Sequence, residues 1–411
     1  MIARDERNRI VVVGIPSRPS TLFHSGSRDT LLDNLSSNVP GGYRIVVVGG
    51  RGTAGSAQDR SEADGDVRAV EIDSPFDRYV LGPLSRLHAL IPGSPGPYFG
   101  FYRDRTYARQ AARLCAEQSA ACIAFGSCPQ WAPLFKEHNP EARLVMFERT
   151  DWLSVAPLRF AKYLTLIDAV ICPHRILAQR IAARFPALSE RLHVVHDGVD
   201  TALFRPNQLR SRHRILYVGR LSPERGVHVL VDAFFSLRER YPDADCILVG
   251  KGERSPRESL LGTAFAGMGS LMGSRFGYRR RILSMISERP GLFLADQVSH
   301  DAMSNLYATA SVLVQPALTD TASGLTLAEA MSSGLPVVAS RCGPAPEMVQ
   351  HGRTGLLVDP GNRQQLVAAI DRIWDNRESA AKMADVARNY ALENLNWQET
   401  AARCLAVIGL R

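Results

Sequence analysis

The chain has 411 residues, of which 45% are hydrophobic and 22% are charged, and this balance excludes an intrinsically disordered protein. The chain is longer than an ordinary domain with a single hydrophobic core, so we expect two domains. The net charge of +8 favours anionic partners. The sequence carries no helix-turn-helix, metal-finger or aromatic ribonucleoprotein pattern, so we predict no nucleic-acid partner.

The amino terminus and the cysteines bear on the compartment. No hydrophobic run approaches the length needed to cross a bilayer, and the charged segment before the first apolar strand lacks the cleavage site of a signal peptide. The seven cysteines form no C-x-x-C pair, which is typical of reduced thiols rather than of a disulfide framework or a zinc site. We therefore expect a cytoplasmic protein.

Short apolar strands alternate with helical patterns in the first half, which predicts a parallel sheet covered by helices. The helices expected there include 29–35 and 103–118. The expected strands are RIVVVGI (9–15), YRIVVVG (43–49), RAVEI (68–72), ACIAFG (121–126), RLVMF (143–147), DAVICP (168–173) and LHVVH (192–196).

A polar, proline-containing connection at 196–213 separates this half from a second alternation. A helix is expected at 226–241, and the expected strands are RILYVG (214–219), DCILVG (245–250), GLFLA (291–295), SVLVQP (311–316) and PVVAS (336–340). The pattern predicts an α/β protein with two Rossmann-like parallel-sheet domains that face each other across a cleft. We place the first domain at 1–205, completed by a helix at 394–411, and the second at 206–393.

The segment RIVVVGGRGTAG (44–55) follows a strand with G-x-G-x-x-G at Gly50, Gly52 and Gly55. A second strand ends near Glu71 and Asp73, at about the distance at which an acid meets a ribose in dinucleotide-binding proteins. However, the residues after the glycines are polar and lack the apolar stripe of the required helix. We therefore favour a loop here and keep an NAD-dependent oxidoreductase as an alternative.

The segment 254–290 mixes apolar residues and glycines with a basic run at 279–281. One interpretation is a partly helical insertion whose arginines are solvated. The other is a patch that lies on an anionic membrane or contacts an acceptor, which would make the protein peripheral at the inner face of the membrane.

Two arginines stand at the end of the first strand of the second half. A glycine turn at Gly219 is followed by Arg220 and Arg225, just before a predicted helix. Guanidinium groups beside a helix N-terminus suit a diphosphate, because each can donate paired hydrogen bonds and the helix dipole adds to them. The alternative is that these are ordinary exposed arginines.

The segment DTASGLTLAEAMSSGLPVVAS (320–340) predicts a turn at Ser323 and Gly324, followed by a short helix that carries Glu329. Such a turn presents backbone N–H groups to an anion above the sheet. Glu329 would then lie near enough to accept hydrogen bonds from sugar hydroxyls. The alternative is a glutamate that only stabilises the start of its helix.

Five segments of the second half, taken together, resemble glycosyltransferase family 4, a family of retaining nucleotide-sugar transferases with the GT-B fold. The resemblance covers 214–376 and is supported by agreement in order and spacing. The segments are ILYVGRLSPERGVHVLVDAF, ILVGKGE, LYATASVLVQPAL, GLTLAEAMSSGLPVVAS and GPAPEMVQHGRTGLLVDP.

The resemblance implies roles for individual residues. Arg220 and Arg225 match a basic pair on the donor diphosphate, although the second is usually a lysine. Glu329 matches the second of two signature glutamates and would hold the nucleotide ribose. The backbone N–H groups of Gly324 and Leu325 would face the donor. The glycine turn at Gly219 and the separate turn at Ser323 would also lie at the donor. Val298 falls where the family's backbone meets the base, although the usual glycine there is Asp296.

The first signature glutamate, which touches the transferred sugar in the family, is replaced here by Thr321. A threonine can bond a hydroxyl but cannot stabilise positive charge as a carboxylate does. We therefore consider Asp320 as a substitute. On the acceptor side, Arg149, Thr150 and Asp151 fall where many members carry a histidine-containing turn. Gly26 would represent the glycine loop after the first strand.

The resemblance thus implies a retaining hexosyltransferase that uses a nucleotide-diphosphate sugar such as a UDP-sugar, and we expect no required metal or other cofactor. The acceptor would be a hydroxyl of a cell-surface glycan, a lipid-linked intermediate or a small metabolite. Two alternatives stay open: a catalytically silent sugar-nucleotide binder, suggested by Thr321, and the NAD-dependent oxidoreductase.

Overall fold

The computed structural model describes residues 9–13, 43–50, 67–72, 105–206, 210–250, 273–288, 290–295, 298–320 and 323–409. They form two compact units that divide at His196 and again after Asn396, so that the last helix belongs to the first unit. The sequence pattern predicts these divisions at 205/206 and 393/394 instead. The segment 197–206 lies with the second unit because Phe204 is buried in its core and the Val199 N–H donates to the Leu395 carbonyl.

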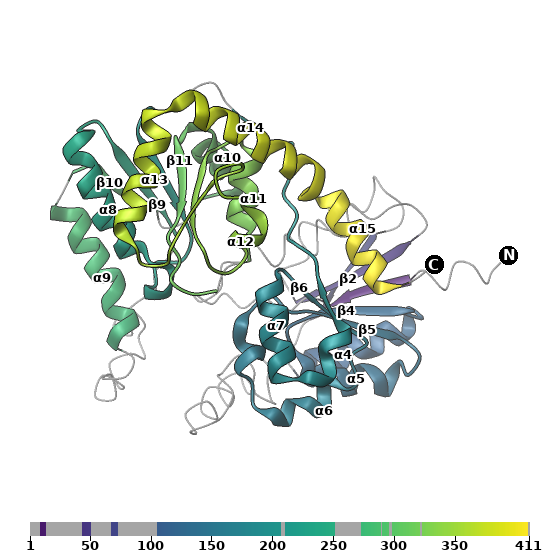
Figure 1. The fold of residues 1–411 in the computed structure, drawn as a ribbon. Helices are drawn as coiled ribbons and strands as arrows, with labels where there is room; N and C mark the ends of the chain where they lie inside the picture. The colour runs from purple at the N-terminus through teal and green to yellow at the C-terminus, as the bar shows by residue number, and fades with distance from the viewer. Residues whose placement is uncertain are drawn as a thin grey trace. The chain divides into compact units, whose positions relative to one another are not determined.

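The sheet of the first unit has seven strands in the order β3-β2-β1-β4-β5-β6-β7. All neighbouring strands are parallel. Each strand predicted for this half is present, and Figure 1 shows the strands of this unit beside its helices. The bounds are β1 Arg9–Val13, β2 Arg44–Gly50, β3 Val67–Ile72, β4 Cys122–Gly126, β5 Arg143–Phe147, β6 Ala169–Cys172 and β7 Leu192–Val194.

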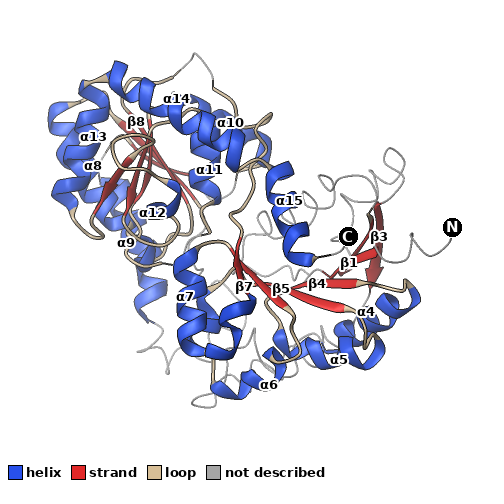
Figure 2. Cartoon of the chain, turned by 45° about the vertical axis from the view of Figure 1, so that its right-hand side comes forward, coloured by secondary structure: helices blue, strands red, loops and turns tan. Residues whose placement is uncertain are grey.

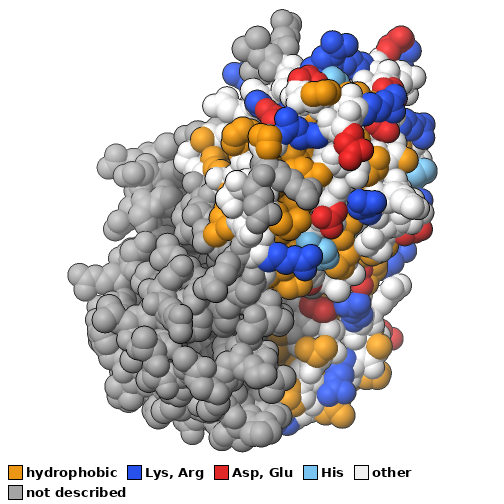
Figure 3. Space-filling model, turned by 90° about the vertical axis from the view of Figure 1, so that its left-hand side faces the viewer, with side chains coloured by type: hydrophobic (Ala, Val, Ile, Leu, Met, Phe, Trp, Pro, Cys, Tyr) orange, Lys and Arg blue, Asp and Glu red, His pale blue; other side chains and the backbone are white. Residues whose placement is uncertain are grey.

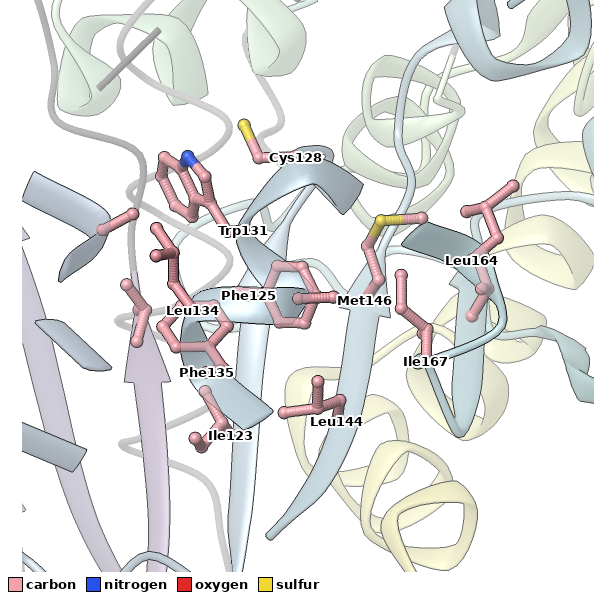
Figure 4. Packing of buried hydrophobic residues seen from close by; sticks show 14 of the residues in the cluster. Ile123, Phe125, Cys128, Trp131, Leu134, Phe135, Leu144, Met146, Leu164 and Ile167 are labelled. Atoms are coloured by element: carbon pink, nitrogen blue, oxygen red, sulfur yellow. The ribbon is translucent and has the colours of Figure 1, made fainter. Parts of the chain in front are cut away.

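Both faces of this sheet are buried, because side chains alternate along a strand and helices cover each side. Val11 and Val13 pack with the helices between the strands, whereas Ile10 and Val12 point to the other face. Figure 4 shows Phe125, Trp131 and Phe135 packed on the first of these faces. The helices are α4 Arg105–Glu117, α5 Ala132–His138, α6 Ala161–Leu164 and α7 Arg175–Arg184, with short 3-10 turns η3 Pro129–Trp131, η4 Asp151–Val155, η5 Leu158–Phe160 and η6 Pro186–Arg191.

The second face is covered by α15 (Trp397–Ile408), although this helix follows the whole second unit in the chain. Trp397, Ala401, Cys404 and Ile408 pack with alternate residues of β1, β4, β5 and β6. Figure 2 shows α15 beside the strands of this sheet. The expected return of the last helix to the first domain is therefore present.

The sheet of the second unit has six parallel strands in the order β10-β9-β8-β11-β12-β13. The predicted strands are all present, and the short β13 is an addition that the sequence analysis did not include. The bounds are β8 Arg214–Val218, β9 Asp245–Val249, β10 Leu292–Ala295, β11 Val312–Gln315, β12 Val337–Ser340 and β13 Leu356–Val358.

Helices cover both faces of this second sheet as well. Ile215 and Tyr217 face a layer that contains α8, α9 and α13, and Leu216 faces a layer that contains α10 and α11. The bounds are α8 Val227–Arg240, α9 Gly273–Glu288, α10 His300–Thr309, α11 Leu325–Ser332, α12 Ala345–Met348, α13 Arg363–Asp375 and α14 Arg377–Asn394, with η7 Pro223–Arg225 before α8.

Several predictions concern residues outside those that the structure describes. They are the helix at 29–35, Gly26, the glycines Gly52 and Gly55 of the dinucleotide-like motif, Asp73, Asp296 and Thr321. The strand before the motif is present and ends at Gly50. Among the described helices, we find none with the length and apolarity that a membrane crossing requires.

Candidate active site

The order of the second sheet identifies where a ligand is expected. From the central strand β8 the chain moves outward through β9 to β10, and it then returns to place β11 on the other side of β8. The carboxyl ends of β8 and β11 are therefore a topological switch point, the place at which open α/β sheets bind ligands. The loop after β8 carries Arg220 and Arg225, and the loop after β11 leads to Gly324.

The loops that follow β8 and β11 are in direct contact. The Leu318 N–H donates to the Glu224 carbonyl at 2.9 Å. Gly226 adopts φ +65°, and a Cβ at this position would overlap the Pro316 carbonyl oxygen. Glycine is therefore required at 226 both by its backbone conformation and by the close approach of the neighbouring loop.

Arg220 and Arg225 lie close enough for their charges to interact. Burial lowers the pKa of Arg225 from its usual value; the Tyr217 hydroxyl opposes this effect, Arg220 adds to it and Glu224 opposes it. Arg220 keeps 35% of its side chain exposed and lies 3.7 Å from the Glu224 carboxylate. Two neighbouring guanidinium groups form a region that favours an anion with more than one negative charge.

Two residues that the sequence analysis did not name shape this loop. Tyr217 is fully buried, and its hydroxyl donates to the Arg220 carbonyl at 2.7 Å, which fixes the backbone at Gly219. Ser222 is buried, and its hydroxyl has no hydrogen-bond partner in the part of the chain that the structure describes. Hydroxyl side chains also occur throughout ordinary loops. The local sequence therefore gave no signal that Tyr217 would hold the loop backbone or that the Ser222 hydroxyl would be buried.

The helix α11 begins at the same edge of the sheet. Its first residue follows Gly324, which adopts φ +93° and whose Cβ would lie 2.6 Å from the Met348 Sδ atom. Leu327 and Ala328 donate to the Gly324 carbonyl. The earlier N–H groups of the helix have no acceptor within it by geometry, so they are available to an anion.

A buried glutamine connects this helix to β8. The Gln315 side-chain amide donates to the Val218 carbonyl and to the Thr326 hydroxyl, both at 2.9 Å. It thereby bridges the switch point and holds the first turn of α11 beside the arginine loop. A polar residue that ends an otherwise apolar strand is the signal by which the sequence analysis would have found it.

Asp320 lies at this edge but is engaged by the backbone. Its Oδ1 atom accepts the Gly343 N–H at 2.5 Å, which ties the loop after β11 to the loop after β12. The Cys342 thiol interacts with charges of this region: burial raises its pKa to about 11, Asp320 adds to the effect and Arg225 opposes it. Three loops therefore converge at one edge of the sheet.

Glu329 lies one turn into α11 and is 6% exposed. Its Oε2 atom accepts the hydroxyl of Tyr307 at 2.7 Å, and Tyr307 belongs to α10. Burial raises the pKa of Glu329 to about 7, and the hydrogen bond from Tyr307 opposes this rise. Glu329 is therefore a buried acid that is poised between its charged and neutral forms near neutral pH.

The other donor-side candidates occupy the same region. Val298 is half-buried and packs on the core layer that contains Tyr307, and Ser323 and Leu325 flank Gly324 with half-buried side chains. The structure thus places Arg220, Arg225, Gly324 and Glu329 at one edge of one sheet.

The acceptor-side candidates lie at the carboxyl end of β5 in the first unit. Asp151 accepts the Ser154 hydroxyl at 2.6 Å and a hydrogen bond from Arg180 at 3.1 Å, so its carboxylate is held by its own unit. The fully buried Glu148, which the sequence analysis did not name, accepts the Thr150 N–H at 2.8 Å and the Thr150 hydroxyl at 2.7 Å. It thereby fixes the turn that carries Arg149.

The described end of the 254–290 segment is the helix α9. Tyr278 and Ile282 are buried in the core of the second unit, while Arg281 is exposed. The Tyr278 hydroxyl accepts the His228 N–H at 2.9 Å, so α9 is linked to the beginning of α8, directly after the arginine loop. This agrees with a partly helical insertion, and membrane contact by the segment stays a prediction.

Positive and negative side chains are mixed on the described part of the surface that Figure 3 shows. On the described surface in Figure 3, basic and acidic side chains are interspersed, so the net charge of +8 does not form a single basic patch on this face. An interspersed surface supports solubility and does not by itself indicate a polyanionic partner.

Comparison with known proteins bears directly on the second unit. Residues 212–376 match the sequence profile of the family described as glycosyl transferases group 1. The chain is also 34% identical over 234 residues to an MMP alpha-(1->4)-mannosyltransferase of Mycolicibacterium hassiacum. That match covers 56% of this chain, and the chain spans about half of that relative, 51% of its length.

Two further comparisons extend over more of the chain. A GDP-mannose-dependent alpha-(1-6)-phosphatidylinositol monomannoside mannosyltransferase of Mycolicibacterium smegmatis is 27% identical, with 75% of this chain and 81% of that protein covered. The crystal structure of Anabaena HepE with UDP and glucose matches with a TM-score of 0.67 at 17% identity, covering 97% of this chain and 99% of that one. The segment 212–376 is thus similar in sequence to the group 1 glycosyltransferases, and the predicted GT-B fold is confirmed.

Proposed function

We propose that the chain is a retaining glycosyltransferase that moves a hexosyl unit from a nucleotide-diphosphate sugar to a hydroxyl of an acceptor. One observation supports this above the others. The loop that carries Arg220 and Arg225 contacts the loop that leads to α11, at the switch point of a sheet whose sequence matches the group 1 glycosyltransferases.

In this proposal the second unit binds the donor and stabilises its leaving group. When the glycosidic bond to the nucleotide breaks, negative charge grows on the diphosphate. The guanidinium groups of Arg220 and Arg225 and the N–H groups at Leu325 would neutralise this charge without reorganisation, because the sheet and helix already hold them in place. Glu329 would accept hydrogen bonds from the ribose.

The remaining features of the proposal concern stereochemistry and the acceptor. We infer retention of configuration from the family resemblance, with the acceptor hydroxyl attacking the face from which the diphosphate departs. The first unit would present the acceptor near the turn that carries Arg149 and Asp151. Asp320 supports the donor loops because its Oδ1 atom accepts the Gly343 N–H, and its use as a substitute carboxylate would fall to the other oxygen.

One alternative is favoured by a specific residue. Thr321 stands where the family has its first signature glutamate, and a threonine cannot stabilise positive charge on the transferred sugar. A protein of this kind would bind the sugar nucleotide without transferring the sugar.

The test is calorimetry with a panel of UDP-, GDP-, ADP- and dTDP-sugars, followed by measurement of free nucleoside diphosphate released with and without candidate acceptors. GDP- and UDP-sugars come first, because a relative's name specifies GDP-mannose and a neighbouring structure holds UDP. We expect saturable binding and release of nucleoside diphosphate. Binding without any release would support the silent binder, and binding of NADH in place of every sugar nucleotide would refute both proposals.

A further inference from the structure

We propose that Tyr307 is a positioning residue of the donor site: its hydroxyl holds one oxygen of the Glu329 carboxylate so that the other oxygen receives the ribose hydroxyls of a nucleoside diphosphate. This inference rests on the proposed function, because it concerns the same donor. It adds a residue that lies 22 positions away in sequence and that touches the ligand only through Glu329.

The contact between the two side chains is short and enclosed. The Tyr307 hydroxyl donates to the Glu329 Oε2 atom at 2.7 Å, and the tyrosine is fully buried. The ring of Phe204 packs edge-on against the Tyr307 ring, with centroids 5.5 Å apart. A buried ring held in this way has little rotamer freedom, so it can fix the carboxylate that it contacts.

Glu329 lies at the distance along α11 at which a ribose is expected. It follows the helix cap Gly324 by five residues, which corresponds to about 7.5 Å along the helix axis. A diphosphate at the first turn is bonded directly to the ribose of its nucleotide, so the ribose is the next group along the helix. Thr326 lies one turn before Glu329 on the same face of α11 and is bonded to Gln315 at the switch point.

The groups around Glu329 explain why its charge depends on Tyr307. On α11 no other described side chain is charged, and on α14, which packs against α11, Arg388 bonds the Ser332 carbonyl at the far end of the helix. Asp385 of α14 raises the pKa of Arg210. Burial raises the pKa of Glu329 to about 7, and the bond from Tyr307 is the influence that lowers it. Loss of that hydroxyl would therefore leave more of the acid neutral at neutral pH, and a neutral acid accepts ribose hydroxyls less strongly.

The experiment replaces the hydroxyl alone, with Tyr307→Phe in the full chain. Binding is measured by calorimetry with three probes: UDP and GDP, their 2′,3′-dideoxy counterparts, and inorganic pyrophosphate. We expect Tyr307→Phe to weaken binding of the nucleotide that the wild type prefers by about tenfold or more. Binding of the dideoxy nucleotide and of pyrophosphate should stay unchanged, because neither has the hydroxyls that Glu329 receives.

Tyr241→Phe is the matched control. The Tyr241 hydroxyl also donates to a carboxylate, that of Asp375, at 2.8 Å, but it lies before β9 at the amino-terminal edge of the sheet. This variant should bind all probes as the wild type does. Circular dichroism and thermal unfolding of both variants report whether the fold is intact.

The pH dependence of nucleotide affinity gives a second measurement. It would not change if Tyr307 had a purely structural role. Wild-type affinity for the ribose nucleotide should fall as pH decreases through about 7, because Glu329 then becomes protonated. In Tyr307→Phe the midpoint of this fall should move to higher pH, and affinity for pyrophosphate should show no such shift.

Two results would overturn the inference while leaving the proposed function intact. One is a wild type that binds UDP or GDP together with a Tyr307→Phe variant of unchanged affinity. The other is an equal loss for the nucleotide, its dideoxy form and pyrophosphate, which would indicate general damage to the unit. A wild type that binds none of the nucleoside diphosphates would instead refute the proposed function, and the inference with it.

Discussion

Arg225 is the residue whose surroundings most directly indicate an anion. It is half-buried near the Tyr217 hydroxyl and the charge of Arg220, and partial burial lowers its pKa from the usual value. A cation in such a position lacks much of its hydration, so it gains more from a bound diphosphate than an exposed arginine does.

Arg225→Ala should therefore lower kcat/KM for sugar transfer by about 30- to 900-fold, which corresponds to about 2–4 kcal/mol of transition-state stabilisation. The control is Arg240→Ala, which removes an exposed arginine from the last turn of α8, where it pairs with Asp371 and Asp375. Steady-state kinetics on both variants make the comparison. Equal activity of the two would contradict the role of Arg225.

Glu329 gives a stability prediction with a definite sign. Burial raises its pKa from 4.5 to about 7, so between these values the folded protein keeps a proton that the unfolded chain has released. The free energy of unfolding therefore falls as pH rises through this window, by about 3 kcal/mol in total, and this group adds no pH dependence below or above it.

Glu329→Gln should remove this loss, because glutamine does not ionise and its carbonyl oxygen can still accept the Tyr307 hydroxyl. We expect the variant to be more stable than the wild type at pH 8 by about 2–3 kcal/mol and equal to it near pH 4.5. Urea unfolding at the two pH values tests this. If the difference in unfolding free energy between variant and wild type is the same at both pH values, the Glu329 carboxylate is not the source of the pH dependence.

The start of α11 depends on a backbone conformation that only glycine adopts readily. Gly324 has φ +93°, and a Cβ there would also lie 2.6 Å from the Met348 sulfur. The turn positions the first N–H groups of the helix, so a change here affects an element rather than a single contact.

Gly324→Ala should weaken binding of a nucleoside diphosphate by more than tenfold, because the first turn of α11 must move to relieve the contact. Gly352→Ala is the matched control: Gly352 also has a positive φ, +79°, but a Cβ there would meet nothing within 4 Å. The control should lose about 1 kcal/mol of stability and keep its affinity for the nucleotide. If the two variants bind equally well, the geometry of this turn is not essential to donor binding.

The division of the chain into two units has consequences for the whole molecule. The first unit is completed by α15, which follows the whole second unit in the sequence. Trp397 of this helix is buried against the first sheet, and Trp374 of α13 is buried in the second unit. Each unit therefore has its own core and its own contribution to stability.

Trp397→Ala should destabilise the first unit by about 3–5 kcal/mol and leave the second unit nearly unchanged. Trp374→Ala should do the reverse. Hydrogen exchange measured by mass spectrometry resolves the two, because peptides from β1 and β4 report on one sheet and peptides from β8 and β11 report on the other. Loss of protection in both sheets for either variant would show that the units do not unfold separately.

Local patterns were sufficient to predict most of the elements. Strands such as 214–219 and 311–316 are short apolar runs between polar turns, and burial on both faces requires such runs in a parallel sheet. The glycine turns and the arginines that follow β8 were also predictable, because each depends on neighbours within a few residues. The three-residue strand β13 was missed because so short a run carries no periodicity.

The sequence alone determined the fold class and the order of the strands along the chain, because these rest on residues close together in the chain. Its local patterns, together with the family resemblance, indicated Arg220, Arg225, Gly324 and Glu329 as donor-side candidates. The tertiary structure alone decided how the side chains of this region are held. The 2.7 Å contact between Tyr307 and Glu329, the bridge made by Gln315 and the tie between Asp320 and Gly343 join residues 11 to 97 positions apart. Such contacts exist only when helices and loops pack on one sheet, because packing brings distant side chains together and removes the water that would otherwise hydrate them.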